Sequence, residues 1–248
     1  MSPTKHFTSK KSSKRPCSDS ENFRSIDVDM AYNDCYKRAT IIMERVVRME
    51  TLENTSIPKV FKERTWTKLL NPSGNVYVEL IREFFVNATV EGDHINCWVR
   101  QKEFIITRES IQELLEVCPP SQQISIQYKD RLDSVKPMAD LLGGSLKKKS
   151  MNIIPFIAEM RTLAYIMIHN LYPIVNLTTL STPRTIFLYD LFTHKEIDIC
   201  YLLTKSITKR NSRTILPFPS LIMALIAKTR LKIPSDLTIV RRDYPIGA

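Results

Sequence analysis

Apolar residues recur at helical spacing in two stretches of the N-terminal half. From Tyr77 to Phe85, large apolar side chains occupy positions i, i+3, i+4, i+7 and i+8, which form one face of a helix. Residues 29–53 carry a second stripe at three- and four-residue steps, made up of Tyr32, Cys35, Tyr36, Ala39, Ile42, Met43 and Val46. This stripe lacks sustained heptads, which favours a face that docks on the main body over a coiled coil. The pattern predicts an amphipathic helix within residues 28–58 and another helix from residue 77 onward.

Short β-type runs follow the second of these helices. Ile95–Val99 and Glu103–Ile106 are rich in β-branched and aromatic residues and flank a short polar turn, which predicts a small β-hairpin. Thr107 is placed to cap a further helix, and Glu109 in the first turn favours the helix dipole. A helix, a hairpin and a second helix are therefore predicted between Tyr77 and Val117.

The C-terminal half is helical by the same criterion. Apolar spacing predicts helices within residues 156–171, 185–192 and 197–207, and from Leu216 onward. The apolar run from Ile153 to Leu171 contains Glu159 and Arg161, so we expect a buried helix and not a membrane span.

Composition sets the expected domain boundaries. Residues 1–27 contain almost no aliphatic side chains and are expected to be disordered, because they cannot bury enough apolar surface. We predict an α+β fold that is mostly α-helical, with two helical lobes and one small β-hairpin. The expected parts are the basic tail (1–27), the amphipathic helix (28–58) and one domain over residues 59–240. Its lobes would span about 59–120 and 151–240, joined by a linker at 121–150.

The net charge of +10 is distributed unevenly along the chain. Residues 1–24 carry +4, residues 25–144 carry −3 and residues 145–248 carry +9. This asymmetry fits a polyanionic partner such as DNA or RNA. It also fits solubility alone or an acidic protein partner, and nucleic acid is favoured only slightly.

Basic segments supply the candidate binding residues. The candidates for nucleic-acid contact are Lys147, Lys148, Lys149, Lys205, Lys209, Arg210, Arg213, Lys228, Arg230 and Lys232. As a group they fit non-specific contact with phosphates. Each taken alone fits a solvated charge or a helix-end cation equally well. In the tail, Lys10, Lys11, Lys14 and Arg15 resemble a nuclear import signal, which weakly favours the nucleus over the cytoplasm.

The sequence contains no catalytic or metal-binding motif. Ser220 lies in Phe-Pro-Ser-Leu-Ile and not in G-x-S-x-G, so we predict a serine at a helix start. His94 and His169 have no partner at metal-ligand spacing. The five cysteines form no C-x-x-C pair, which predicts free thiols. We therefore expect no enzyme activity, no metal and no cofactor.

A metal-dependent nuclease would need converging carboxylates for its metal ions. Asp190, Glu196 and Asp198 lie close together in the sequence and are the nominees for such a site. Nothing in their spacing distinguishes them from ordinary surface acids.

Two blocks of residues resemble a known family. The first is Leu80-Ile81-Arg82-Glu83-Phe84-Phe85-Val86-Asn87-Ala88 with Trp98-Val99-Arg100-Gln101-Lys102, and the second is Arg184-Thr185-Ile186-Phe187-Leu188-Tyr189 with Ile197-Asp198-Ile199 and Phe218-Pro219-Ser220-Leu221-Ile222. Together they resemble the putative plant transposon protein domain over about residues 60–235. The resemblance implies a plant source and a transposable-element context, and it carries over no catalytic or binding residue.

The chain departs from the family pattern at several positions. Phe85 stands where tyrosine is usual, and Gln101 stands where glycine is usual. The second difference predicts that the hairpin turn avoids positive φ angles.

The preferred hypothesis is a transposable-element-derived, non-catalytic protein that associates with nucleic acid through basic surface patches. One alternative is a gag-like scaffold that self-associates or binds host or element proteins through the stripe in residues 29–53. A metal-dependent nuclease or transposase is the third.

Overall fold

The computed structural model describes residues 22–118, 120, 140, 145–147, 150–208, 215–241 and 246, with only the backbone for 145–147. The helices are α1 (Ile26–Asp34), η2 (Tyr36–Arg38), η3 (Met49–Leu52), α2 (Ile57–Glu63), α3 (Thr67–Leu70), α4 (Val78–Asn87), α5 (Arg108–Leu115), α7 (Ala158–Ile166), the π-helix η5 (Met167–Leu171), α8 (Thr182–Phe192), α9 (Ile199–Thr208) and α10 (Pro219–Lys228). The strands are β1 (Thr40–Ile42), β2 (Val76–Tyr77), β3 (Thr89–Glu91), β4 (His94–Val99), β5 (Lys102–Ile106), β6 (Ser145–Lys147), β7 (Ser150–Asn152), β8 (Thr179–Ser181), β9 (Ile215–Pro217) and β10 (Ile239–Val240).

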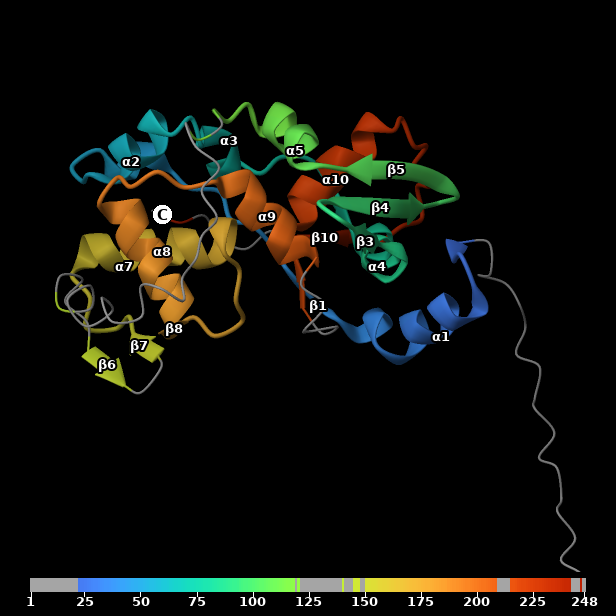
Figure 1. The fold of residues 1–248 in the computed structure, drawn as a ribbon, viewed down its shortest axis with the longest axis horizontal. Helices are drawn as coiled ribbons and strands as arrows, with labels where there is room; N and C mark the ends of the chain where they lie inside the picture. The colour runs from blue at the N-terminus through green and yellow to red at the C-terminus, as the bar shows by residue number, and fades with distance from the viewer. Residues whose placement is uncertain are drawn as a thin grey trace, which may run out of the picture.

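The fold is α+β and mostly helical, as predicted. The strands form two three-stranded and two two-stranded sheets within the described residues, so the expectation of a single hairpin understated the β structure. In Figure 1 the β3–β4–β5 sheet and α4 lie at one end of the long axis, and the β6–β7–β8 sheet lies at the other.

The segment from helix to hairpin to helix follows the sequence pattern closely. Leu80, Ile81 and Phe84 on α4 are fully buried, as the apolar spacing requires. β4 alternates buried and half-buried residues, because one face of the hairpin packs on α4. Thr107 caps α5 by accepting a hydrogen bond from the Ser110 amide, which confirms the predicted cap.

The predicted helix over residues 29–53 is wrong. α1 ends at Asp34, and the chain then extends so that β1 pairs in parallel with β9. Ala39, Met43 and Val47 from this region are buried in the core. The apolar residues of the stripe are therefore buried from an irregular segment. Pairing of β1 with β9 favours this segment over a continuous helix.

Long-range pairings connect the two halves of the chain. In addition to β1–β9, β2 pairs with β10, and Val47 bridges Ile246. The buried apolar residues of both halves belong to one contiguous cluster. The division into two lobes stays a prediction, and the basic tail and most of the linker lie outside the described residues.

The helices predicted in the second half are present as α7 with η5, α8, α9 and α10. The last begins at Pro219 and not at Leu216, which lies in β9. Within the described ranges, none of the helices combines the length and the apolar character that crossing a bilayer requires.

Candidate functional site

The Arg-Glu-Phe block of α4 holds the β4–β5 turn. The buried Glu83 carboxylate accepts a hydrogen bond from the Arg100 amide (2.5 Å) and pairs with Arg100 Nε (3.2 Å). Burial raises the pKa of Glu83 to about 7, against the opposing effects of the Arg100 amide and guanidinium. Glu83 is thus a buried acid that anchors the hairpin to the helix.

The turn itself departs from its prediction. Arg100 and Gln101 have φ angles of 49° and 62°, although neither is glycine. Positive φ at both central residues is what a two-residue turn needs to match the strand twist. The register of β4 and β5 explains these positive φ angles. Val99 pairs with Lys102, so only two residues remain for the loop.

Replacing Gln101 with glycine should therefore raise the free energy of unfolding by about 0.5–1 kcal/mol, because glycine adopts positive φ without the steric cost of a Cβ. Urea denaturation of the wild type and the variant measures this. Gln101→Ala is the matched control, since alanine removes the side chain but keeps the Cβ and should give no gain. A glycine variant no more stable than the alanine variant would contradict the account.

Asn87 of the same block binds the N-terminal segment. Its amide nitrogen donates to the Asn22 carbonyl (3.0 Å), and its oxygen accepts from the Arg24 amide (3.3 Å). The Arg24 guanidinium then lies over the Trp98 ring and pairs with Glu103 (3.3 Å). This motif asparagine fixes the start of the described chain against α4 and the sheet.

Arg184 of the second block closes the end of the π-helix. Its guanidinium donates to the carbonyls of Tyr172 (3.3 Å) and Pro173 (3.2 Å) and lies 4.2 Å from the centroid of the Tyr172 ring. Carbonyls at a helix end lack intrahelical donors, and Arg184 supplies them. The conspicuous arginine is therefore a cap for η5.

Glu44 caps α10 from a distant part of the chain. Its carboxylate accepts hydrogen bonds from the amides of Ser220 (3.0 and 3.1 Å) and Leu221 (3.2 Å). Phe218 precedes the helix with φ 56° and offers no capping side chain. Burial raises the pKa of Glu44, and the amide hydrogen bonds oppose that rise. Ser220 lies at the helix start, as predicted. No sequence signal points to the Glu44 carboxylate as the cap.

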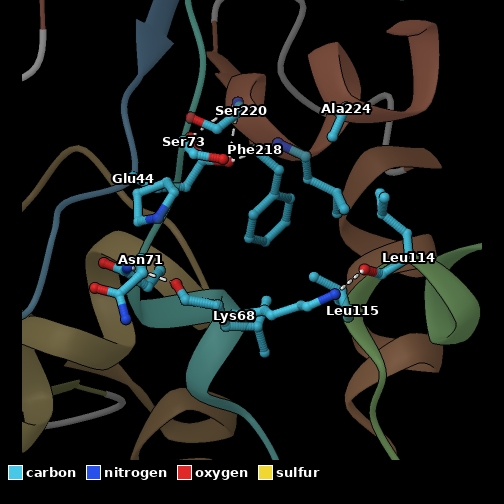
Figure 2. A pocket seen from close by; sticks show the side chains of 13 residues that line it. Glu44, Lys68, Asn71, Ser73, Leu114, Leu115, Phe218, Ser220 and Ala224 are labelled. Atoms are coloured by element: carbon cyan, nitrogen blue, oxygen red, sulfur yellow. Dashed lines mark hydrogen bonds between the residues drawn. The ribbon is translucent and has the colours of Figure 1, made fainter. Parts of the chain in front are cut away.

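A cavity of about 270 Å³ lies beside this cap. Figure 2 shows Glu44 and Ser220 on one side, Lys68 and Leu115 on another, and the Phe218 ring projecting between them. The cavity is small for a ligand site. The carboxylate of Glu44 is already used by α10, so the arrangement serves the fold.

Asn170 connects the same region to α3. Its Nδ2 donates to the carbonyls of Arg45 (2.7 Å) and Leu69 (2.8 Å), and its Oδ1 accepts from the Arg45 amide (3.3 Å). A buried amide with these three bonds fixes the backbone next to Glu44 and at the end of α3. Sequence spacing gives no signal for this contact, because the partners lie 125 and 101 positions away.

The three nominated carboxylates do not form a metal site. Asp198 is buried and pairs with Arg108 (2.6 Å). It also accepts a hydrogen bond from the Tyr201 amide at the start of α9. Asp190 is buried near Lys195, and Glu196 is exposed. Throughout the part of the chain that the structure describes, no three His, Cys, Asp or Glu side chains are grouped where they could hold a metal ion.

His94, His169, Cys97 and Cys200 lie in surroundings that suit structural roles. His94 lies near Asp93 (3.6 Å), and His169 is buried on η5. Cys97 and Cys200 are free and buried, and burial raises the pKa of each thiol to about 12. Thiols that stay protonated at neutral pH are poor nucleophiles and poor metal ligands.

The structure places only some of the predicted basic residues. Lys205, Lys228, Arg230 and Lys232 are exposed, and Lys228 pairs with Glu113 (3.0 Å). Figure 1 shows β6, which ends at Lys147, at the opposite end of the long axis from the segment that directly follows α10. Lys10, Lys11, Lys14, Arg15, Lys148, Lys149, Lys209, Arg210 and Arg213 lie outside the described residues.

The blocks that hold the turn, the end of the π-helix and the start of α10 lie within a stretch that matches a family model. The profile of the family described as "Putative plant retrotransposon-related domain" matches residues 62–231. The chain belongs to this family. The predicted membership of a plant mobile-element family, over about residues 60–235, is thereby confirmed. No curated protein and no solved structure matches the chain.

The conspicuous residues of the retrotransposon-related domain serve its own fold. Glu83 holds a turn, Arg184 closes a π-helix, and Phe218–Ile222 begins a helix that Glu44 caps. Each of these contacts joins segments that are separated in the sequence. In this chain these residues therefore hold the architecture of the domain.

Proposed function

We propose that this retrotransposon-derived protein is non-catalytic and associates with nucleic acid through exposed cations of its C-terminal half. The observation that carries the proposal is that Lys205, Arg230 and Lys232 are exposed cations and that, within the described ranges, none of them pairs with a carboxylate. Unpaired exposed cations are available to replace the counterions of a phosphate backbone.

Two of these cations lie on segments that flank one helix. α5 packs against both α9, which carries Lys205, and α10, which leads into Arg230. The C-terminal residues 145–248 carry a net charge of +9, so further cations lie in the same part of the sequence. The basic cluster at Lys10–Arg15 fits entry into the nucleus, where a polyanionic partner would be met.

The gag-like alternative loses the surface that suggested it. The stripe in residues 29–53 is not an exposed helix face, since Ala39 and Met43 are buried. The metal-dependent alternative loses its nominated residues, since Asp198 is engaged by Arg108. Ile26 and Met30 on α1 are exposed, but neither belongs to the stripe that suggested the gag-like alternative.

The triple variant Lys205→Ala, Arg230→Ala and Lys232→Ala tests the proposal. If these cations contact phosphates, the variant should bind a labelled DNA duplex at least about tenfold more weakly at low salt. The slope of log K against log salt should fall in magnitude by about 3, close to one for each cation removed from the phosphate backbone. Fluorescence anisotropy measures both quantities.

The matched control removes the same charge from the N-terminal half, as Lys37→Ala, Arg38→Ala and Lys62→Ala, all of which are exposed. This control should keep most of the affinity. Equal losses of affinity in both triple variants would show that net charge alone acts, and no binding by the wild type would remove the proposal.

A further inference from the structure

One face of α9 borders a groove of about 440 Å³, which is large enough for a nucleotide. Tyr201, Thr204, Lys205 and Thr208 line it from the helix, at the spacing of one helix face. The other wall comes from β3 and the β3–β4 turn (Val90, Gly92, Asp93) and from the start of α5 (Arg108, Glu109), and Asp198 lines the groove from just before α9. We call this the α9 groove.

An aromatic ring and a cation lie together in the α9 groove. Tyr201 is 37% exposed, which is unusual for a large side chain on a helix that is otherwise well buried. The Lys205 ammonium lies 5.4 Å from the centroid of the Tyr201 ring. An exposed ring beside a cation offers a stacking surface for a base and a partner for its phosphate.

The acids of the groove decide what kind of ligand fits. Arg108 and Asp198 neutralise each other at 2.6 Å. Asp93 and Glu109 remain as exposed carboxylates. Hydrogen bonds from the backbone amide of Glu109 and from the Thr107 side chain lower the pKa of Glu109. Among the described residues no carboxylate pairs with Lys205, which stays available to a phosphate, and Asp93 and Glu109 add acceptors to the same groove. A ligand that also presents N–H donors gains from both.

A nucleotide with an exocyclic amino group has this combination. Carboxylates accept hydrogen bonds from amino groups such as the N4 amino group of cytosine. A base can stack on the Tyr201 ring only after it leaves its own stack, which costs roughly a few kcal/mol in a duplex and less in a single strand. A single strand is therefore the partner that fits the groove.

We infer that the α9 groove binds one unstacked, amino-bearing base of a single-stranded nucleic acid. Tyr201 stacks on the base, Asp93 and Glu109 accept from its amino group, and Lys205 contacts the adjoining phosphate. This inference rests on the proposed association with nucleic acid and adds a preference for single strands. No covalent step is involved.

Fluorescence anisotropy with the full chain tests this inference, using labelled oligo(dC), oligo(dT) and a duplex, each of about twelve nucleotides. Tyr201→Ala should weaken oligo(dC) binding by about tenfold or more and leave duplex binding unchanged. Tyr201→Phe, which keeps the ring, should bind like the wild type. Circular dichroism confirms that each variant is folded. The double variant Asp93→Ala and Glu109→Ala, which removes both acceptors, should lose the preference for oligo(dC) over oligo(dT).

The outcomes separate the two proposals. If the wild type binds the duplex and Tyr201→Ala binds oligo(dC) as well as the wild type does, the groove is overturned and the general association stands. The groove is also overturned if Tyr201→Phe loses as much affinity as Tyr201→Ala. If the wild type binds none of the three probes at low salt, both proposals fail.

Discussion

Replacing Glu44 with alanine is expected to lower the free energy of unfolding by about 3 kcal/mol, because it leaves the buried amides of Ser220 and Leu221 without an acceptor. Glu44 is only 5% exposed, so the amides from which it accepts hydrogen bonds are buried with it. Phe218 has no side-chain acceptor that could replace the carboxylate. Urea denaturation at pH 7 measures the change.

Two comparisons make this expectation specific. Glu44→Gln keeps one oxygen acceptor and should lose about half as much stability as Glu44→Ala. Glu50→Ala removes an exposed carboxylate only six residues away and should change stability by less than about 0.5 kcal/mol. A Glu44→Ala protein as stable as the Glu50→Ala control would show that α10 does not depend on this cap.

The second large effect is a dependence of stability on pH through Glu83. The pKa of Glu83 is about 7 in the folded protein, against an ordinary value of 4.5. Between these two values the folded state binds a proton that the unfolded state releases, so stability falls as pH rises from about 4.5 to about 7. The difference corresponds to roughly 3 kcal/mol over that window.

Comparison with Glu83→Gln isolates this contribution, because other groups titrate in the same range. Glu44 has a raised pKa and acts in the same direction, and Glu109 has a lowered pKa and acts in the opposite direction. Denaturation of both proteins at pH 5 and pH 7.5 is the measurement. We expect the wild type to gain roughly 2–3 kcal/mol relative to Glu83→Gln on acidification. Parallel pH profiles would contradict a buried, proton-binding Glu83.

Local pattern predicted the elements whose contacts are local. The spacing from Tyr77 to Phe85 and the cap at Thr107 report side chains that face a nearby core, and α4 and α5 follow them. The stripe in residues 29–53 has similar spacing, but β1 pairs with β9, which lies about 175 positions away in the sequence. Spacing cannot distinguish these cases, because both bury apolar residues every three or four positions.

The polar contacts were beyond sequence reasoning for a related reason. Glu44 meets Ser220 across 176 positions, and neither residue carries a motif that names the other. Gln101 shows the converse: turn chemistry argued against positive φ, and strand register together with the Glu83 contact imposed it. Family membership, in contrast, was readable from the sequence, because it depends on the pattern itself.

The division between architecture and surface has a consequence for variants of this domain. Changes at Glu44, Glu83 or Asn170 should act on folding, because their partners are buried backbone groups. Changes at Lys205, Arg230 or Lys232 should act on association and leave stability nearly unchanged, because these side chains are exposed.

The salt dependence of DNA binding tests the proposed association most directly. A duplex labelled with fluorescein is titrated with the wild-type protein at several salt concentrations between about 50 and 200 mM. Three or more phosphate contacts predict a linear fall of log K with log salt and a loss of affinity of about 40-fold or more across this range. Affinity that does not change with salt, or no binding at the lowest salt concentration, would contradict association through the exposed cations.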